Sequence, residues 1–149
     1  MLLKFNQIML SQFNSNPMAY KSFPCKNFSI ITVADQEALI LALGRGCYIS
    51  LTGFQEFTEI ILIDYYLIHN LGIILLKNTI AYHNNFNHKI VLDCKNSLSY
   101  TIFALENEFK YIILSKVPKE VFASLKELAI SKESQLFADQ ENVFEYFRN

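Results

Sequence analysis

The sequence predicts a single three-layer α/β domain built on a mainly parallel sheet of about five strands. Two observations lead to this prediction. Short β-branched runs alternate along the chain with segments of helical periodicity, which is typical of parallel strands connected by helices. The chain also has 149 residues, of which 52% are hydrophobic and 18% charged, enough to bury the core of one domain without disulfide bonds.

The beginning of the chain differs from the rest because it shows no regular period and contains two prolines. We therefore expect an N-terminal extension over 1–27 and one α/β domain over 28–149. Met9 and Met18 are alternative start positions, and the short apolar run at the beginning makes a poor signal peptide. We expect a cytoplasmic protein.

The first predicted strand covers 28–33. Asp35 follows it as the N-cap of a helix, because its carboxylate accepts hydrogen bonds from amides of the first turn. A second strand is predicted over 47–51. The tetrapeptide Thr52-Gly53-Phe54-Gln55 then fits the capping box, so we expect a helix from Phe54 onward.

Residues 60–76 form the most apolar stretch of the chain, but Asp64 and other polar residues interrupt it, so no membrane span is predicted. The expected helix is apolar on both faces, which is typical of a deeply buried or interface helix. The segment from Phe54 to Leu76 is therefore a candidate homo-oligomer interface. Residues 73–84 fit a strand or a helix, and the short distance to the next strand favours a helix bent at Gly72.

The last third of the chain has the clearest pattern. Strands are predicted over 89–93, 111–115 and 134–138, and helices are predicted after Asn96 or Ser97, from Pro118 onward, and over 142–147. With right-handed connections and helices on both faces of the sheet, this pattern predicts a flavodoxin-like, doubly wound architecture.

Ligands of such sheets bind beyond the carboxyl ends of the strands, near helix amino termini. The candidate ligand-site residues all follow predicted strands: Asp35, Thr52, Asp93, Cys94, Lys95, Ser115 and Lys116. Catalytic residues stay unknown, because no pair of titratable groups has a recognisable acid–base arrangement.

Cys94 has the most reactive predicted setting of these residues. A helix amino terminus and the neighbouring Lys95 favour its thiolate, whereas Asp93 opposes it. It is interpreted either as a nucleophilic or redox thiol or as a small, half-buried turn residue. The arginine-closed cradle of cysteine phosphatases and the CxxC pair of thioredoxin-like proteins are both missing from the sequence.

Several other functions lack their sequence signals. The formal net charge of −1 leaves no basic excess for a phosphate backbone, so no nucleic-acid partner is expected. The sequence has no glycine-rich phosphate loop, serine elbow or HExxH motif. His83 and His88 match no strong metal-ligand spacing. We expect neither a cofactor nor a metal. The three cysteines are an odd number without CxxC spacing, which favours reduced thiols in the cytosol.

Two resemblances bear on these expectations. The stretch from about Tyr48 to Phe137 resembles a group of small, uncharacterised bacterial α/β proteins, through the motif Ile90-Val91-Leu92-Asp93-Cys94, the helix segment Phe103-Ala104-Leu105 and the pair Leu128-Ala129. Members of that group often have glycine-rich turns where this chain has Lys95-Asn96-Ser97. The resemblance implies an α/β fold and no particular reaction.

The chain is also similar to receiver domains, since Asp35, Asp93 and Ser115 follow strands at matching positions. It departs from them in having one acid after the first strand and Asp139 where a lysine is expected. The favoured interpretation is a non-catalytic binding or interaction domain. The alternatives are a small-molecule enzyme and a degenerate receiver-like domain, each with its site around Asp93 and Cys94.

Overall fold

The computed structural model describes residues 20–23, 28–45, 48–49 and 56–148. Within these residues the sheet has seven strands in the order β1-β2-β4-β5-β6-β7, and β3 pairs with β4. The strands are β1 Tyr20–Phe23, β2 Phe28–Val33, β3 Tyr48–Ile49, β4 Glu56–Ile63, β5 Lys89–Asp93, β6 Tyr111–Ile113 and β7 Gln135–Phe137. The five strands β2, β4, β5, β6 and β7 are parallel, whereas β1 and β3 are antiparallel to their partners.

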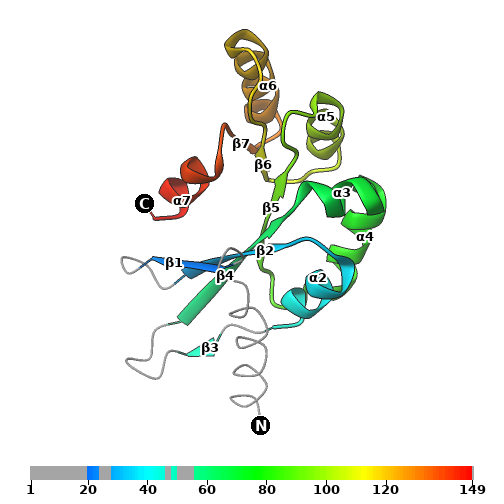
Figure 1. Ribbon diagram of the computed structural model, residues 1–149, viewed down its shortest axis with the longest axis vertical. Helices are drawn as coiled ribbons and strands as arrows, with labels where there is room; N and C mark the ends of the chain where they lie inside the picture. Colours follow the sequence, from blue (N-terminus) through cyan, green and yellow to red (C-terminus); the bar gives the residue numbers. More distant parts are fainter. Residues whose placement is uncertain (1–19, 24–27, 46–47, 50–55, 149) are drawn as a thin grey trace.

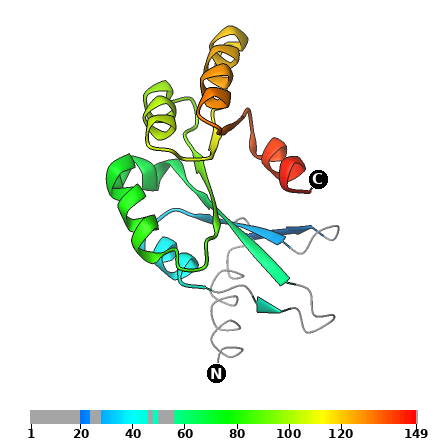
Figure 2. The ribbon, with the colours of Figure 1, turned by 180° about the vertical axis from the view of Figure 1, so that it is seen from behind.

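Helices cover both faces of this sheet. The described helices are α2 Gln36–Leu43, α3 Tyr65–Leu71, α4 Ile73–His83, α5 Leu98–Glu106, α6 Lys119–Ser131 and α7 Gln140–Arg148. Figures 1 and 2 show α2 to α6 on one side of the sheet and α7 on the other. The predicted three-layer α/β fold with five mainly parallel strands is therefore confirmed.

The order of the parallel strands in the sheet differs from that of flavodoxin-like proteins. The parallel strands follow one another in chain order, whereas the strands of flavodoxin-like sheets have the order 2-1-3-4-5. When right-handed crossovers always proceed in one direction, their helices all lie on the same face. Helices α2 to α6 do so, and of the described helices only α7, which no described strand follows, lies on the opposite face.

The core is correspondingly divided by the sheet. On the side of α2 to α6, alternate strand residues pack with the helices; they include Ile31, Val33, Ile61, Ile63, Leu92 and Ile112. On the side of α7, the intervening residues pack with Val143 and Phe144; they are Ile30, Ile60, Leu62, Val91, Ile113 and Phe137.

The largest error of the sequence prediction is the helix expected from Phe54 onward, because residues Glu56–Ile63 form strand β4. Residues Ile60 to Ile63 are each at most 2% exposed, because β4 lies between β2 and β5 and both of its faces are covered. A strand buried on both faces is apolar at every position and loses the usual alternation. The apolar excess that suggested a homo-oligomer interface is thus largely internal to the sheet.

The first 55 residues also differ in part from the prediction. The strand expected over 47–51 is described only at Tyr48–Ile49, and it is antiparallel to β4. Residues 50–55, with Thr52 and its capping box, lie outside the described residues. Strand β1 falls within the predicted N-terminal extension and pairs with β2, so the described part of the sheet already includes Tyr20–Phe23, before the predicted domain start at Phe28.

The helix preferred over 73–84 is confirmed as α4, and the bend at Gly72 separates it from α3. Gly72 has φ 78° and ψ 158°, a backbone conformation that is nearly restricted to glycine. It ends α3 by donating its amide to Ile68 O at 2.8 Å and begins α4 by accepting from Leu76 N at 3.0 Å.

Helices α5 and α6 both end in a Schellman motif, with glutamate at the left-handed position. At the end of α6, Ser134 N donates to Ala129 O at 2.8 Å and Glu133 N donates to Ile130 O at 3.0 Å. Glu133 has φ 58°, and Glu108 occupies the same place after α5 with φ 67°.

We expect Glu133→Gly to raise the free energy of unfolding by about 0.5–1 kcal/mol, because glycine adopts this conformation without strain. The gain is limited because glycine also makes the unfolded chain more flexible. Chemical denaturation measures it. As the matched control, Glu127→Gly inside α6 should lower stability by about 1 kcal/mol. A loss of stability in both variants would contradict the prediction.

Candidate functional site

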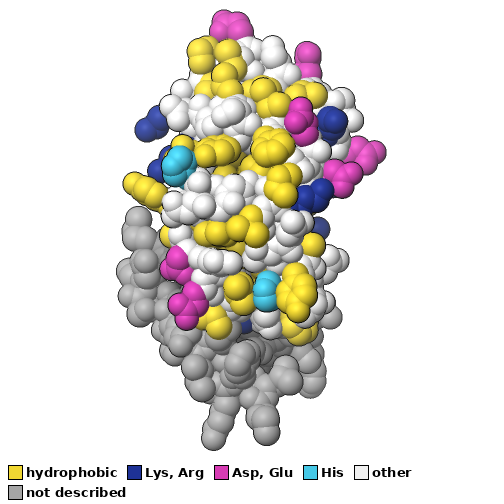
Figure 3. Space-filling view, turned by 90° about the vertical axis from the view of Figure 1, so that its right-hand side faces the viewer, with side chains coloured by type: hydrophobic (Ala, Val, Ile, Leu, Met, Phe, Trp, Pro, Cys, Tyr) yellow, Lys and Arg dark blue, Asp and Glu magenta, His cyan; other side chains and the backbone are white. Residues whose placement is uncertain are grey.

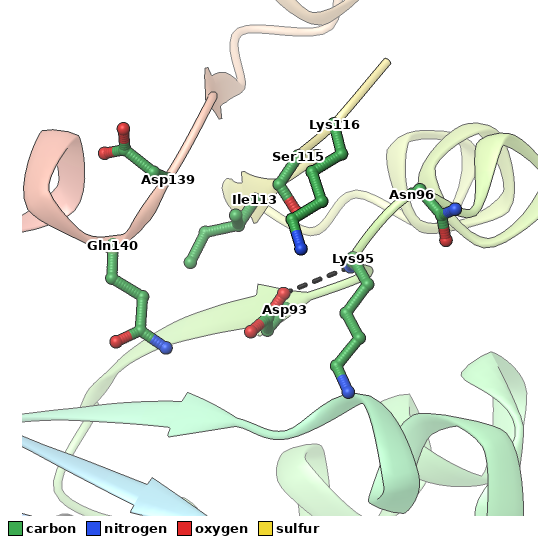
Figure 4. Close-up of a pocket in the computed structure, with 8 residues that line it drawn as sticks. All are labelled: Asp93, Lys95, Asn96, Ile113, Ser115, Lys116, Asp139 and Gln140. Carbon is green, nitrogen blue, oxygen red and sulfur yellow. Dashed lines mark hydrogen bonds between the residues drawn. The ribbon is translucent and has the colours of Figure 1, made fainter.

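Four of the seven predicted site residues meet in one pocket. Asp93, Lys95, Ser115 and Lys116 line a hollow of about 410 Å³ at the carboxyl ends of β5, β6 and β7 (Figure 4). The remaining lining residues are Asn96, Ile113, Asp139 and Gln140. A hollow is therefore present at the edge of the parallel sheet where ligand sites are generally expected.

The pocket lies where the chain changes from one face of the sheet to the other. Helices α5 and α6 leave β5 and β6 toward one face, and α7 leaves β7 toward the opposite face. Asp139 lies at this change and caps α7, because Asn142 N donates to its Oδ1 at 2.8 Å. Helices that diverge to opposite faces leave a crevice between them, which is the usual origin of sites in open α/β sheets.

Asp93 is the half-buried acid of this pocket. Its Oδ1 accepts a hydrogen bond from Lys95 N at 3.1 Å, and the Gln140 side chain lines the same pocket. Burial raises the pKa of Asp93, and the nearby Asp64 carboxylate raises it further, while the hydrogen bond from Lys95 N and the Lys95 charge lower it. The net effect is upward, so the site favours a proton or another positive group at this carboxylate.

The two lysines of the pocket share an uncommon backbone conformation. Lys95 has φ 49° and Lys116 has φ 58°, both in the left-handed region. Their loops are joined directly, since Ser115 N donates to Lys95 O at 2.7 Å. In the view of Figure 4, Lys116 and Gln140 point into the space beside Asp93, whereas the Lys95 side chain runs toward α3.

Lys95 reaches a group of aromatic side chains next to the pocket. Its Nζ lies 5.3 Å from the ring centroids of both Tyr65 and Tyr66, within the range of cation–π attraction. Tyr65 stacks on His69 with 5.9 Å between centroids, and His69 Nδ1 lies 2.9 Å from the Tyr100 hydroxyl. These contacts hold the Lys95 ammonium at the rim rather than inside the hollow.

Cys94 is not part of the pocket, and its predicted reactive thiolate is wrong. Its side chain has no exposed surface and packs in the core on the side of α2 to α6. Burial raises the pKa of this thiol to about 12, and the neighbouring Asp93 adds to the increase, although a Thr101 hydrogen bond lowers it. Adjacent strand positions face opposite sides, so Asp93 and Cys94 separate.

We expect the Cys94 thiol to be inert in the folded protein, because it is protonated at neutral pH and shielded from solvent. A variant in which Cys25 and Cys47 are replaced by serine leaves Cys94 as the single thiol. Ellman's reagent should label it slowly at pH 8 and rapidly after unfolding in urea. Labelling of the folded variant at the rate of a free thiol would contradict this expectation.

Besides Cys94, two further predicted site residues are not placed in the pocket. Asp35 caps α2, with Ala38 N donating to its Oδ1 at 2.8 Å, and it follows β2. Strand β4 separates β2 from β5, so Asp35 and Asp93 do not follow neighbouring strands. Thr52 lies outside the described residues.

The sequence analysis missed Asp139 and Gln140 as site residues. The signal was available, because they directly follow the last predicted strand in the same way that Asp93 follows β5. Among the residues that the structure describes, no group of three or more His, Cys, Asp or Glu side chains is arranged to hold a metal ion. No described helix is long and apolar enough to cross a membrane.

Comparison with known proteins identifies no protein similar to this chain. No family model matches the chain, and searches of curated proteins and of solved structures find no match. The resemblance to small bacterial α/β proteins stays a prediction.

Proposed function

We propose that this chain is a non-catalytic binding domain that takes a small zwitterionic ligand of the amino-acid class in the pocket at the ends of β5 to β7. The observation that carries the proposal is the Asp93 carboxylate. It is half-buried, its pKa is raised, and no described lysine or arginine makes an ion pair with it. A ligand ammonium placed there would offset the cost of burying this charge.

The charge of the lining supports a ligand that carries both signs. Asp93 and Asp139 supply two carboxylates, Lys116 supplies an ammonium group, and the ammonium group of Lys95 lies at the rim, so both signs of charge are present. Lys116 is the natural partner for a ligand carboxylate, since it points into the space beside Asp93. The volume of about 410 Å³ lies in the usual range for small-molecule sites.

A binding role is favoured over the two alternatives by what surrounds Asp93. The thiol proposed as a nucleophile for an enzyme, that of Cys94, is buried away from the pocket. The receiver-like pairing of Asp35 with Asp93 that the sequence suggests is not formed, because β4 lies between the strands that precede them; the acid that follows the neighbouring strand is Asp64.

The proposal is tested by a ligand series that removes one charge at a time. L-Serine carries both charges, N-acetyl-L-serine lacks the ammonium, and serinol lacks the carboxylate; other amino acids extend the series. In ¹H–¹⁵N NMR titrations, we expect the best zwitterion to perturb residues 93–96, 113–116 and 139–140. Each truncated analogue should bind at least about tenfold more weakly, equivalent to about 1.4 kcal/mol.

Variants of the two charged residues identify which ligand group each recognises. Asp93→Asn should remove the preference for the ammonium, and Lys116→Gln should remove the preference for the carboxylate. Lys126→Gln, on the exposed side of α6, is the control with the same charge change and should alter nothing. Failure of every amino acid to bind at about 10 mM would reject the proposal. Chemical conversion of the bound ligand would favour the enzyme alternative.

Asp93→Asn has a second expected effect that needs no ligand. Asparagine keeps the acceptor for Lys95 N but carries no charge, so the variant should gain under about 1 kcal/mol of stability at pH 7. Because the folded-state pKa of Asp93 is raised, the wild type loses stability as the pH rises through that pKa. The difference between the two proteins should therefore vanish below about pH 3, and a difference independent of pH would contradict this account.

Self-association through the segment from Phe54 to Leu76 has less support than ligand binding. Among its residues whose burial the structure describes, 60–76, the exposed large apolar ones are Tyr66, Ile74 and Leu75. Figure 3 shows hydrophobic side chains spread over the helical face among polar atoms rather than gathered in one patch. Sedimentation equilibrium tests this interface: a dimer that Leu75→Glu dissociates would support it, and a monomer would reject it.

A further inference from the structure

A second hollow lies at the opposite edge of the sheet from the candidate site. It has a volume of about 430 Å³ and adjoins the amino ends of β5 and β6, between the last turns of α4 and α5. None of its lining residues belongs to the first pocket. It therefore requires its own explanation.

Three lysines from three different elements converge on this second hollow. Lys77 comes from α4, Lys89 begins β5, and Lys110 immediately precedes β6. The lining has a single carboxylate, Glu108, so the formal excess is two positive charges. Within the described part of the chain, none of the three ammonium groups makes an ion pair. Lys89 Nζ instead lies 5.9 Å from the Tyr111 ring centroid.

These lysines are not needed to cap the neighbouring helix. Cations often gather at a helix carboxyl terminus because its last carbonyl groups lack partners. In α5 those carbonyls are satisfied within the chain: Phe103 O accepts from Asn107 Nδ2 at 2.8 Å, and Ala104 O accepts from Phe109 N at 3.1 Å. The excess positive charge is thus available to a bound anion.

His88 lines the same hollow and has a buried hydrogen-bond acceptor on its ring. The residue is 6% exposed, and its Nε2–H donates to Arg45 O. Burial lowers the pKa of His88, so the ring is neutral and Nδ1 is an acceptor. Among the described atoms, Nδ1 has no hydrogen-bond partner. Buried polar atoms are rarely left in this state, and a bound hydroxyl or amino group is one way to satisfy them.

We propose that this hollow binds a small organic phosphate ester whose body is flat and apolar and carries a hydrogen-bond donor. The phosphate oxygens would lie among Lys77, Lys89 and Lys110, since lysine ammonium groups bind phosphate as point charges. The body would contact Ile80, Ile90 and Phe109, which give the hollow its apolar wall. The donor would pair with His88 Nδ1 after a small shift of the ring, since this atom has less than 1 Å² of exposed surface.

Adenosine monophosphate is a suitable probe, because it can be divided into its two parts. Adenosine lacks the phosphate, and inorganic phosphate lacks the flat body. Calorimetric and NMR titrations of the full chain should show AMP binding at least about tenfold more tightly than either part. The NMR shifts should map to residues 77–81, 87–90 and 107–111.

Charge-matched double variants separate this site from general attraction of anions. Lys89→Gln with Lys110→Gln should weaken AMP binding at least about tenfold and leave adenosine binding unchanged. Lys126→Gln with Lys132→Gln removes the same charge from exposed positions on and just after α6 and should leave AMP binding intact. Asp93→Asn, in the first pocket, should also leave it intact.

Three results would overturn the proposal. The first is the absence of AMP binding, and the second is equal affinity for AMP and inorganic phosphate. The third is an equal loss of affinity in both double variants, which would indicate attraction by net charge alone. Thermal melts of each variant show whether it is folded, and the four lysines substituted here are all exposed.

Discussion

Ile61→Ala is expected to lower the free energy of unfolding by about 3–4 kcal/mol, the largest loss among the substitutions proposed here. Ile61 has no exposed surface, and it lies in β4 between β2 and β5. It packs with the main core on the side of α2 to α6. Truncation would remove transfer free energy and leave a cavity that sheet neighbours on both sides cannot easily fill.

Urea denaturation of three variants tests this prediction. Ile61→Val removes one methyl group and should cost about 0.5–1.5 kcal/mol. Ile130→Ala is the control in α6, where the side chain is 65% exposed, and its effect should stay within about 0.5 kcal/mol. Equal losses for Ile61→Ala and Ile130→Ala would contradict the central position of β4.

Gly72→Ala is expected to lower the free energy of unfolding by about 2–3 kcal/mol. A Cβ at Gly72 would meet no atom within 4 Å, so the cost does not come from crowding. It comes from φ 78° and ψ 158°, which a residue with a Cβ adopts only under strain. Relief of that strain would move α3 relative to α4, and the buried residues Ile68 and Ile73 on either side oppose such movement.

Gly44→Ala is the matched control for Gly72→Ala. Gly44 has φ −78° and ψ −7°, which alanine adopts freely, and its added Cβ would lie 3.4 Å from Ile40 O. We expect a change within about 0.5 kcal/mol, since the unfolded chain becomes less flexible. Thermal melts should show a fall of about 3 °C per kcal/mol for Gly72→Ala and almost none for Gly44→Ala. Similar falls in both would contradict the strain argument.

The sequence predicts the last third of the fold well because local signals and tertiary structure agree there. Strand β5 is found at the predicted residues 89–93, and Ser97 caps α5 by accepting from Tyr100 N at 3.2 Å. Helix α6 has Lys119 and Glu120 exposed at its start, as its pattern predicts. Each element has a strong cap or a regular period, so local preference is sufficient to define it.

The segment that becomes β4 could not be assigned in this way. Residues 60–63 are apolar at every position because this part of the strand is buried on both faces, so the alternation that marks a half-covered strand is absent. Their apolar spacing also fits a helix, and the following residues Tyr65 to Leu71 do form one. Only the pairing of β4 with both β2 and β5 resolves the ambiguity, and pairing is not a local property.

The candidate site was predictable as an edge of the sheet but not in its details. The strand ends place Asp93, Lys95, Ser115 and Lys116 together. Which face each side chain takes depends on strand register, so the burial of Cys94 was not foreseen. The side of the sheet that α7 covers depends on a packing choice after β7, and this choice brings in Gln140.

The chain-order arrangement of the parallel strands also bears on how the protein is made. In a sheet whose first strand lies at its centre, a strand that is synthesised early can complete its pairing only after a much later strand has been synthesised. Here each of β4, β5, β6 and β7 can pair with a parallel strand that the ribosome has already released. Assembly can therefore proceed from the amino to the carboxyl end, one strand and its helix at a time. The pocket, which needs β7 and α7, would be the last part to form.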